Sequence, residues 1–371
     1  MRINGFTYIK MNNYITFYVN PSWRRNSIMH TPILNPWWGN PLNESSLFTK
    51  QLFDTYAFNT ECYTITDDIN KANVVLVPYP HGWLVKNDVT FLKKCLLIAQ
   101  KAGLPLLIDG SGDIEYPING ENVYVLRYGG YRFSLEKGGI QIPLFGDDLL
   151  ERYRNGELSF RKKGREKPIV GFAGWANIAL FQLVKIFIKE LPIRLKSVFD
   201  IRYRACRKGV LYRRKAIKIL HDSPLITLQA HIRNSFSGTS KTATGDMRKL
   251  QKQMVDTIMH SDYALDIRGD ANNSARLFEI LSLGRIPVII DTERNFPFSD
   301  KIDYSSFSLI VDFRDMNHLP ELIAKFHNSI SPERFIEMQK NARDAYIRYF
   351  RIDAIMRSIV EELHKKISQQ Y

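Results

Sequence analysis

Apolar and polar positions alternate in blocks along the chain, in a pattern typical of α/β proteins. In the first half, short apolar runs predict strands at residues 14–19, 74–78, 104–108 and 123–126. Residues 91–102 lie between two of these runs and carry apolar side chains at helical spacing. Strands that alternate with helices in this way predict parallel strands joined by crossover helices.

The second half repeats this alternation after a charged stretch that is poor in large apolar residues, residues 149–167. We expect strands at 169–172, 225–228, 263–267, 286–290 and 308–311, and helices at 178–191 and 247–259. The pattern predicts a first domain over residues 1–160 and a second over 161–350. A C-terminal helix at 351–371 is expected to pack back on the first domain.

The composition supports two cores and sets limits on the class of protein. A chain of 371 residues, 44% of them hydrophobic, exceeds the size at which one core stops growing. The three cysteines are far apart in sequence, which argues against a disulfide framework and a Cys-x-x-Cys site. No apolar run reaches the eighteen or so residues that cross a bilayer, and the N-terminus is polar. We therefore expect a cytoplasmic protein.

The formal net charge of +14 predicts an anionic partner. Residues 202–218 hold eight basic residues and no acidic one, and residues 161–167 hold five basic residues and one acidic one. Because no recognition motif accompanies these segments, we favour solvated faces over a nucleic-acid surface. We predict no nucleic-acid partner, and a peripheral contact with an anionic membrane as the further use of this charge.

One stretch, residues 263–290, combines a strand, a polar glycine loop, an amphipathic helix and a second strand. Ser274 is a suitable N-cap for the helix, and Gly284 a suitable stop. In such a unit the loop lies beyond the carboxyl end of the first strand, where open α/β sheets bind ligands. Free N–H groups at the start of the helix suit a phosphate.

Arg276 and Glu279 lie one turn apart on that helix. A guanidinium in the first turn can join the helix N–H groups on a diphosphate, and the carboxylate can accept hydrogen bonds from ribose hydroxyls. The alternative is an ion pair on the helix face, worth a few tenths of a kcal/mol. The spacing alone leaves both interpretations open.

The order and spacing of five blocks resemble the signature of the exostosin family of glycosyltransferases, GT47. The blocks are 262–269 (DYALDIRG), 274–279 (SARLFE), 284–290 (GRIPVII), 296–298 (FPF) and 302–307 (IDYSSF). The resemblance implies a GT-B fold, in which two Rossmann-like domains face each other across a cleft. It also implies inverting transfer from a nucleotide sugar that the C-terminal domain binds.

Two departures from the family pattern limit what the resemblance implies. The chain lacks the membrane anchor and the disulfide pattern that are usual in eukaryotic members. The family's cysteine before the Ile-Pro-Val run is Arg285 here. These features point to a bacterial or viral relative with a different acceptor.

The expected site residues follow from the motif, the resemblance and the predicted strand ends. The donor set comprises Arg276, Glu279, Ser274, Arg268, Gly269, Asn273, Gly171, Gly174 and Arg233. Candidate bases at the ends of strands in the first domain are Asp109, Asp113 and His81. A turn whose carboxylates bond local N–H groups is the alternative for the two aspartates, and an ordinary loop histidine is the alternative for His81.

The sequence has no Asp-x-Asp triplet, and its histidines are scattered. We therefore expect no metal and no cofactor, with a helix N-terminus and arginines stabilising the leaving group. The resulting hypothesis is a hexosyl- or pentosyltransferase that moves a sugar from a nucleotide diphosphate to a glycan or polysaccharide. The family resemblance alone implies that the nucleotide is UDP. Alternatives are a sugar-nucleotide epimerase of GT-B type, an inactive carbohydrate-binding module, and a basic nucleic-acid-binding protein.

Overall fold

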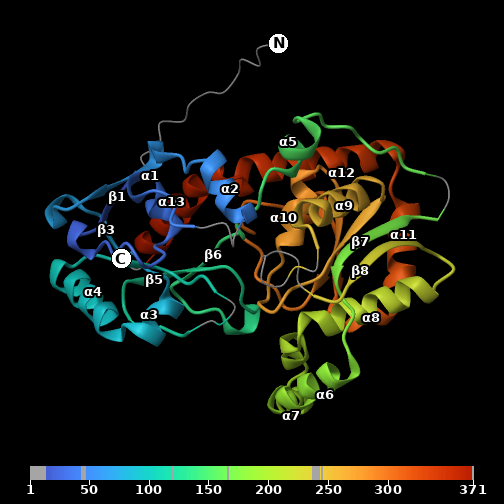
Figure 1. Cartoon of the computed structure of the whole chain (residues 1–371), viewed down its shortest axis with the longest axis horizontal. Coiled ribbons are helices and arrows are strands. Elements are labelled where there is room, and N and C mark those ends of the chain that lie inside the picture. Colours follow the sequence, from blue (N-terminus) through green and yellow to red (C-terminus); the bar gives the residue numbers. More distant parts are fainter. Residues whose placement is uncertain are drawn as a thin grey trace.

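A computed structural model describes residues 14–42, 47–112, 114, 116–118, 120–164, 167–235, 243 and 245–369. The chain forms two α/β domains that lie side by side (Figure 1). The first domain is built on a six-stranded sheet with the order β2-β1-β3-β4-β5-β6, in which all neighbours are parallel. Its strands are β1 (Ile15–Tyr18), β2 (Tyr63–Thr66), β3 (Val74–Leu76), β4 (Leu106–Asp109), β5 (Val123–Arg127) and β6 (Gly139–Gln141).

The second domain is built on a five-stranded parallel sheet with the order β11-β10-β9-β7-β8. Its strands are β7 (Ile169–Trp175), β8 (Thr227–Arg233), β9 (Tyr263–Asp266), β10 (Ile286–Asp291) and β11 (Leu309–Asp312). Counted along each domain, both sheets follow the doubly wound order 2-1-3-4-5, and the first adds a sixth strand. The order reverses between β1 and β3 and between β7 and β9, the positions where such sheets bind ligands. This topology confirms the predicted class of two Rossmann-like domains.

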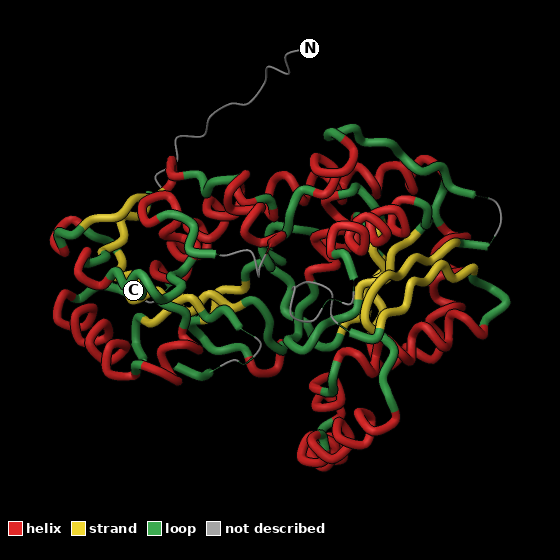
Figure 2. Tube along the Cα trace, viewed as in Figure 1, coloured by secondary structure: helices red, strands yellow, loops and turns green. Residues whose placement is uncertain are grey.

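Helices cover both sheets (Figure 2). The first domain carries α1 (Asn35–Trp38), α2 (Leu47–Thr55), α3 (His81–Asn87) and α4 (Val89–Ala102). The remaining helices are α5 (Leu149–Arg154), α6 (Leu180–Lys189), α7 (Leu191–Phe199), α8 (Gly209–Asp222), α9 (Met247–Met259), α10 (Ala275–Ser282), α11 (Leu319–Ser329), α12 (Pro332–Ala345) and α13 (Ile352–Ser368). The central strands are buried along their length, as the continuous apolar runs predict: β3, β4, β5, β9 and β10 are buried at every position, whereas the edge strand β8 is partly exposed.

The end of the chain returns to the first domain. Ile355, Met356 and Ile359 of α13 belong to the same apolar cluster as β1, β3, β4 and β5. In Figure 1, α13 lies among the elements of the first domain, whereas α12 lies over the second. The two domains are therefore linked twice, by the segment after β6 and by the turn from α12 to α13.

The segment after β6 belongs to the second domain earlier than the expected boundary at residue 160. Leu149 and Leu150 of α5 pack with Met254 of α9 and Ile280 of α10 in one apolar cluster. The charged composition of residues 149–167 concealed this amphipathic turn, whose two leucines are buried while its basic residues remain outside. The structure places α5 with the C-terminal sheet.

No helix in the described ranges is long and apolar enough to cross a membrane.

Candidate functional site

The glycine loop predicted from sequence connects β9 to α10 at the carboxyl edge of the second sheet. Ser274 caps α10, its hydroxyl accepting a hydrogen bond from the Arg276 N–H at 3.2 Å. The Gly269 N–H donates to the Asn273 carbonyl at 2.8 Å and closes the loop on itself. Gly284 follows the helix with a φ of +60°, a conformation that suits glycine. The first turn of α10 therefore lies at the carboxyl edge of the sheet, where its free N–H groups suit an anion.

Arg276 makes the ion pair that the spacing allowed, and more. Its Nε lies 3.1 Å from Glu279 Oε2, and its Nη2 donates to the Ala173 carbonyl of β7 at 2.8 Å. The third nitrogen, Nη1, is buried and has no hydrogen-bond partner among the described residues. A buried donor without a partner is costly unless a ligand supplies an acceptor. The ion pair and a ligand-binding role are thus compatible.

Two further arginines gather beside Arg276. Arg213 on α8 donates from Nη2 to the Ile267 carbonyl at 3.1 Å, and burial lowers the pKa of its guanidinium to about 10, with the positive charge of Arg276 as the next cause. Arg233, at the end of β8, donates to the Leu250 carbonyl at 2.7 Å. Burial and then Arg276 lower its pKa as well. Arg276 thus repels the guanidinium groups of both Arg213 and Arg233, and the three side chains form a region suited to an anion.

Two residues of the predicted donor set instead hold the loop against the first domain. Arg268 is almost fully buried and donates to the Ala205 carbonyl at 2.8 Å and to the Tyr131 hydroxyl. The Asn273 amide donates to the Tyr128 carbonyl. Because Tyr128 directly follows the end of β5, these bonds bring the carboxyl edges of the two sheets together. Arg268 and Asn273 are positioning residues for the loop.

The three glycines of the donor set serve different purposes. A Cβ on Gly171 would lie 2.3 Å from Ser261 Oγ, so this glycine allows α9 to pack against β7. A Cβ on Gly174 would lie 3.9 Å from Arg276 Nη2, and one on Gly269 would lie 3.9 Å from Arg213 Nη2. Gly174 and Gly269 thus border the arginine group, whereas Gly171 belongs to the core.

Two of the candidate bases in the first domain, Asp109 and His81, are buried. Asp109, the last residue of β4, has no exposed surface; its Oδ1 accepts from the Ser111 N–H at 2.8 Å, whereas its Oδ2 has no partner in the described part of the chain. Burial raises the pKa of Asp109 and lowers that of His81 to about 4. His81 is 2% exposed at the start of α3. Asp113 lies outside the described residues. Asp109 therefore offers no surface to an acceptor hydroxyl in this conformation.

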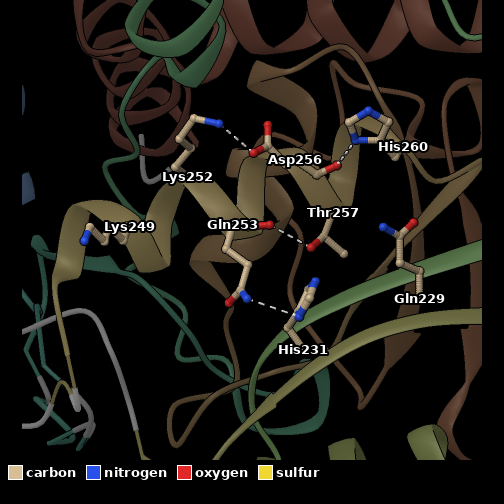
Figure 3. A pocket seen from close by; sticks show the side chains of 8 residues that line it. All are labelled: Gln229, His231, Lys249, Lys252, Gln253, Asp256, Thr257 and His260. Atoms are coloured by element: carbon tan, nitrogen blue, oxygen red, sulfur yellow. Dashed lines mark hydrogen bonds and ion pairs between the residues drawn. The ribbon is translucent and has the colours of Figure 1, made fainter.

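A separate cavity of about 380 Å³ lies between the edge strand β8 and helix α9 (Figure 3). Its lining is polar, and Gln253 Nε2 lies 3.2 Å from His231 Nδ1 across it. None of the predicted site residues lines this cavity, which is lined by Gln229, His231, Lys249, Lys252, Gln253, Asp256, Thr257 and His260. Among the described residues no group of three or more His, Cys, Asp or Glu side chains is arranged to hold a metal ion.

Comparison with known proteins places the arginine group within a recognised domain. Residues 210–326, from α8 to α11, match the model of the exostosin GT47 domain. The chain carries an exostosin GT47 domain. The five sequence blocks all lie within these residues, so the predicted resemblance is confirmed for this part of the chain, which contains Arg213, Arg233 and the whole loop from Arg268 to Glu279.

The relatives support this family over parts of the chain. The Exostosin-1 homolog of Caenorhabditis elegans is 34% identical over 115 residues, 30% of this chain and 29% of the relative. The probable arabinosyltransferase ARAD1 of Arabidopsis thaliana is 23% identical over 226 residues, 60% of this chain and 47% of the relative. The matched segments thus span less than half of either relative. The crystal structure of S. aureus TarM is similar with a TM-score of 0.34 and 9% identity, over 78% of this chain and 55% of that one.

Within the GT47 domain, the structure adds one residue that the sequence did not single out. Arg213 lies in the basic run 202–218, which looked like a solvated face. Its position on α8 brings it beneath the loop, because Gly209 lets the start of α8 approach that loop closely: a Cβ on Gly209 would lie 2.3 Å from the carbonyl oxygens of Arg268 and Gly269. The glycine at the start of the basic helix was the available signal.

Proposed function

We propose that the chain is an inverting glycosyltransferase that moves a sugar from a nucleotide diphosphate sugar, UDP-linked, to a glycan or polysaccharide acceptor. The buried, unpartnered Nη1 of Arg276, at the first turn of α10 and beside Arg213 and Arg233, carries this proposal. A diphosphate offers the acceptor oxygens that this nitrogen lacks. It also relieves the repulsion among three guanidinium groups.

The site residues divide the work of the proposed transfer. Arg276 and the N–H groups of α10 bind the diphosphate and stabilise the charge that develops on it as the sugar leaves. Glu279 lies one turn along the helix and is partly exposed, and it accepts hydrogen bonds from ribose hydroxyls. Its ion pair with Arg276 orients the guanidinium. Because the arginines supply positive charge at the leaving group, the proposed transfer requires no metal.

The acceptor side is assigned to the first domain. Asp109 is the proposed base, reached when the turn that holds its Oδ1 opens, and a raised pKa moves this carboxylate toward the range useful for proton transfer near neutral pH. Asp113 and His81 remain the other candidates.

The proposal is tested by calorimetric titration of UDP, GDP, CDP and dTDP into wild type, Arg276→Ala and Arg334→Ala, with and without EDTA. Arg334 is a matched control, since it forms an i,i+3 ion pair with Glu337 at 2.9 Å, as Arg276 does with Glu279. We expect selective, EDTA-insensitive binding of UDP that weakens about tenfold or more in Arg276→Ala and persists in Arg334→Ala.

Other outcomes separate the parts of the proposal. Nucleotide binding that disappears with EDTA would contradict metal independence but would still be consistent with a donor site at Arg276. Selective binding of another nucleotide would change the donor class. The absence of any nucleotide binding, or equal binding by Arg276→Ala, would overturn the donor site.

A further inference from the structure

A helical hairpin, formed by α6 and α7, projects from the second domain (Figure 1). Neither helix has a single buried residue. Helices of nine or ten residues are marginal in water by themselves and usually owe their stability to an apolar face packed against a core. The two helices pack against each other, and α7 also packs against the short helix that follows, Ile201–Cys206.

The outer surface of the hairpin is strongly apolar. Of the twenty large apolar side chains that are exposed in the described part of the chain, ten lie between residues 180 and 201. They include Leu180 at 78% exposure, Leu195 at 66%, Val198 at 77% and Phe199 at 91%. Exposed apolar side chains gathered in one short segment indicate an interaction surface, whereas single ones scattered over a protein are ordinary.

The exposed residues share one face of each helix. On α6, residues 180, 181, 184, 187 and 188 follow the spacing of a single helical stripe, and on α7 residues 191, 195, 198 and 199 do the same. The other positions carry the exposed Lys185, Lys189 and Lys196 beside the partly buried Leu183, Ile186 and Ile193. We call these apolar residues the hairpin stripe.

Basic side chains flank the stripe. Residues 180–208 contain eight Lys and Arg residues against Glu190 and Asp200. Glu190 is buried and paired with Arg194 and Arg207, and Asp200 is paired with Arg202, so the acidic charges are neutralised within the hairpin. Lys185, Lys189 and Lys196 remain exposed. The surface that surrounds the stripe is therefore cationic.

We propose that the α6–α7 hairpin docks on an anionic lipid membrane, with the stripe in the headgroup region and the lysines against lipid phosphates. Short amphipathic helices with Phe and Leu on one face and Lys on the flanks bind the membrane plane in this way, through apolar burial and charge together. A surface that binds a soluble protein has less need of an apolar stripe and flanking lysines together than a surface that binds an anionic membrane. The inference does not depend on the proposed transferase activity.

The root of the hairpin gives this docking a consequence for the site. The hairpin is inserted between β7 and α8, and the Ala205 carbonyl at its base accepts a hydrogen bond from Arg268 of the glycine loop at 2.8 Å. A membrane bound at the hairpin therefore lies on the same edge of the second sheet as the arginine group. Docking would orient this edge toward molecules held at the bilayer surface.

Flotation of the full chain with vesicles tests the proposal. The vesicles are phosphatidylcholine alone or phosphatidylcholine mixed with phosphatidylglycerol, and the variants are Leu195→Asp combined with Phe199→Asp, Lys185→Gln combined with Lys189→Gln, and Leu97→Asp. Leu97, 54% exposed on α4, is the control for placing a carboxylate on an exposed leucine away from the hairpin. The substituted hairpin side chains are exposed, so folding does not depend on them.

We expect wild type and Leu97→Asp to float with the anionic vesicles and much less with phosphatidylcholine alone. The apolar double variant should bind about tenfold more weakly or worse, and each lysine removed should cost about fivefold. Failure of wild type to bind anionic vesicles, or equal binding by the apolar double variant, would overturn the proposal. So would sedimentation that shows a lipid-free dimer lost in that variant, because a second copy would then cover the stripe.

Discussion

Arg276 on α10 donates from Nη2 to the carbonyl oxygen of Ala173 on β7, 2.8 Å away. This bond fixes the guanidinium across the position where the strand order of the second sheet reverses. Nε is paired with Glu279 at 3.1 Å, so two of the three nitrogens have partners. Because the guanidinium is planar and rigid, these two contacts also fix the direction in which Nη1 points. A helix-face ion pair here preorganises the residue for a ligand.

Arg213 should contribute to nucleotide binding although it lies on a different helix. We expect Arg213→Gln to weaken binding of the nucleotide by about 10- to 100-fold, since a charge-assisted contact is worth about 1.5–3 kcal/mol. Arg214→Gln is the matched control, because this neighbouring arginine is exposed. Isothermal titration of both variants checks the prediction. If Arg213→Gln binds the nucleotide as tightly as Arg214→Gln does, Arg213 only donates to the Ile267 carbonyl and does not contact the nucleotide.

A buried ion pair at the end of β9 should dominate the local stability. Asp266 Oδ2 and Arg294 Nη1 are 2.6 Å apart, and the side chains are 0% and 2% exposed. We expect Asp266→Ala to lower the free energy of unfolding by about 3–5 kcal/mol, because Arg294 is then left as a buried, uncompensated charge. Urea denaturation measures the effect.

The matched surface pair sets the scale for that measurement. Asp344 and Arg348 are 3.7 Å apart and 60% and 64% exposed. Asp344→Ala should change the free energy of unfolding by less than about 1 kcal/mol. Similar losses for the two variants would show that Arg294 finds other compensation when Asp266 is removed.

The sequence was most informative where one short segment determines its own structure. The apolar run that became β10, the Ser274 cap and Gly284 placed the β9–α10–β10 unit within about a residue of its observed limits, because strand, cap and stop are local signals. The short edge strands β2 and β6 were missed, since three or four residues carry little periodicity.

Features that depend on distant segments could not be predicted in this way. The spacing of Arg276 and Glu279 was visible, whereas the bond to Ala173 requires the register of a strand a hundred residues earlier. Asp109 was correctly placed at a strand end, but its complete burial depends on the packing of other segments around that end. Arg213 was hidden in a basic run of which five other members are exposed.

His81 should make the fold sensitive to acid. Its pKa is lowered from 6.5 to about 4, first by burial and then by the charge of Arg127. Above about pH 6.5 the imidazole is neutral in both states, and stability does not depend on it. Between about pH 6.5 and pH 4 only the unfolded chain takes up the proton, so the free energy of unfolding falls by up to about 3 kcal/mol.

Urea denaturation at about pH 7 and about pH 4 checks this acid sensitivity in His81→Phe and His221→Gln. The phenylalanine variant should lose less stability between the two values than wild type does. His221 is 78% exposed and should leave the dependence unchanged. The same acid loss in His81→Phe would assign the effect to other groups.

Asp109→Asn should separate stability from turnover. The raised pKa means that ionised Asp109 penalises the fold: as pH rises past the unfolded pKa, the unfolded chain loses its proton first and stability falls. An asparagine removes this penalty and keeps the oxygen that accepts from Ser111. We therefore expect unfolding stability near neutral pH to be retained or increased, while a lost base lowers the rate of sugar transfer by about 10²- to 10⁴-fold.

Asp303→Asn is the control for this last experiment, since Asp303 also accepts from an N–H two residues on, that of Ser305 at 3.0 Å, but at an exposed turn. Initial rates are measured with the nucleotide sugar whose nucleotide binds, and stability by urea denaturation. Transfer at the wild-type rate in Asp109→Asn would make Asp109 a turn residue and leave Asp113 and His81 as the candidate bases. A loss of both rate and stability would show that the carboxylate is needed for the fold, because a base that acts only in transfer leaves unfolding unchanged.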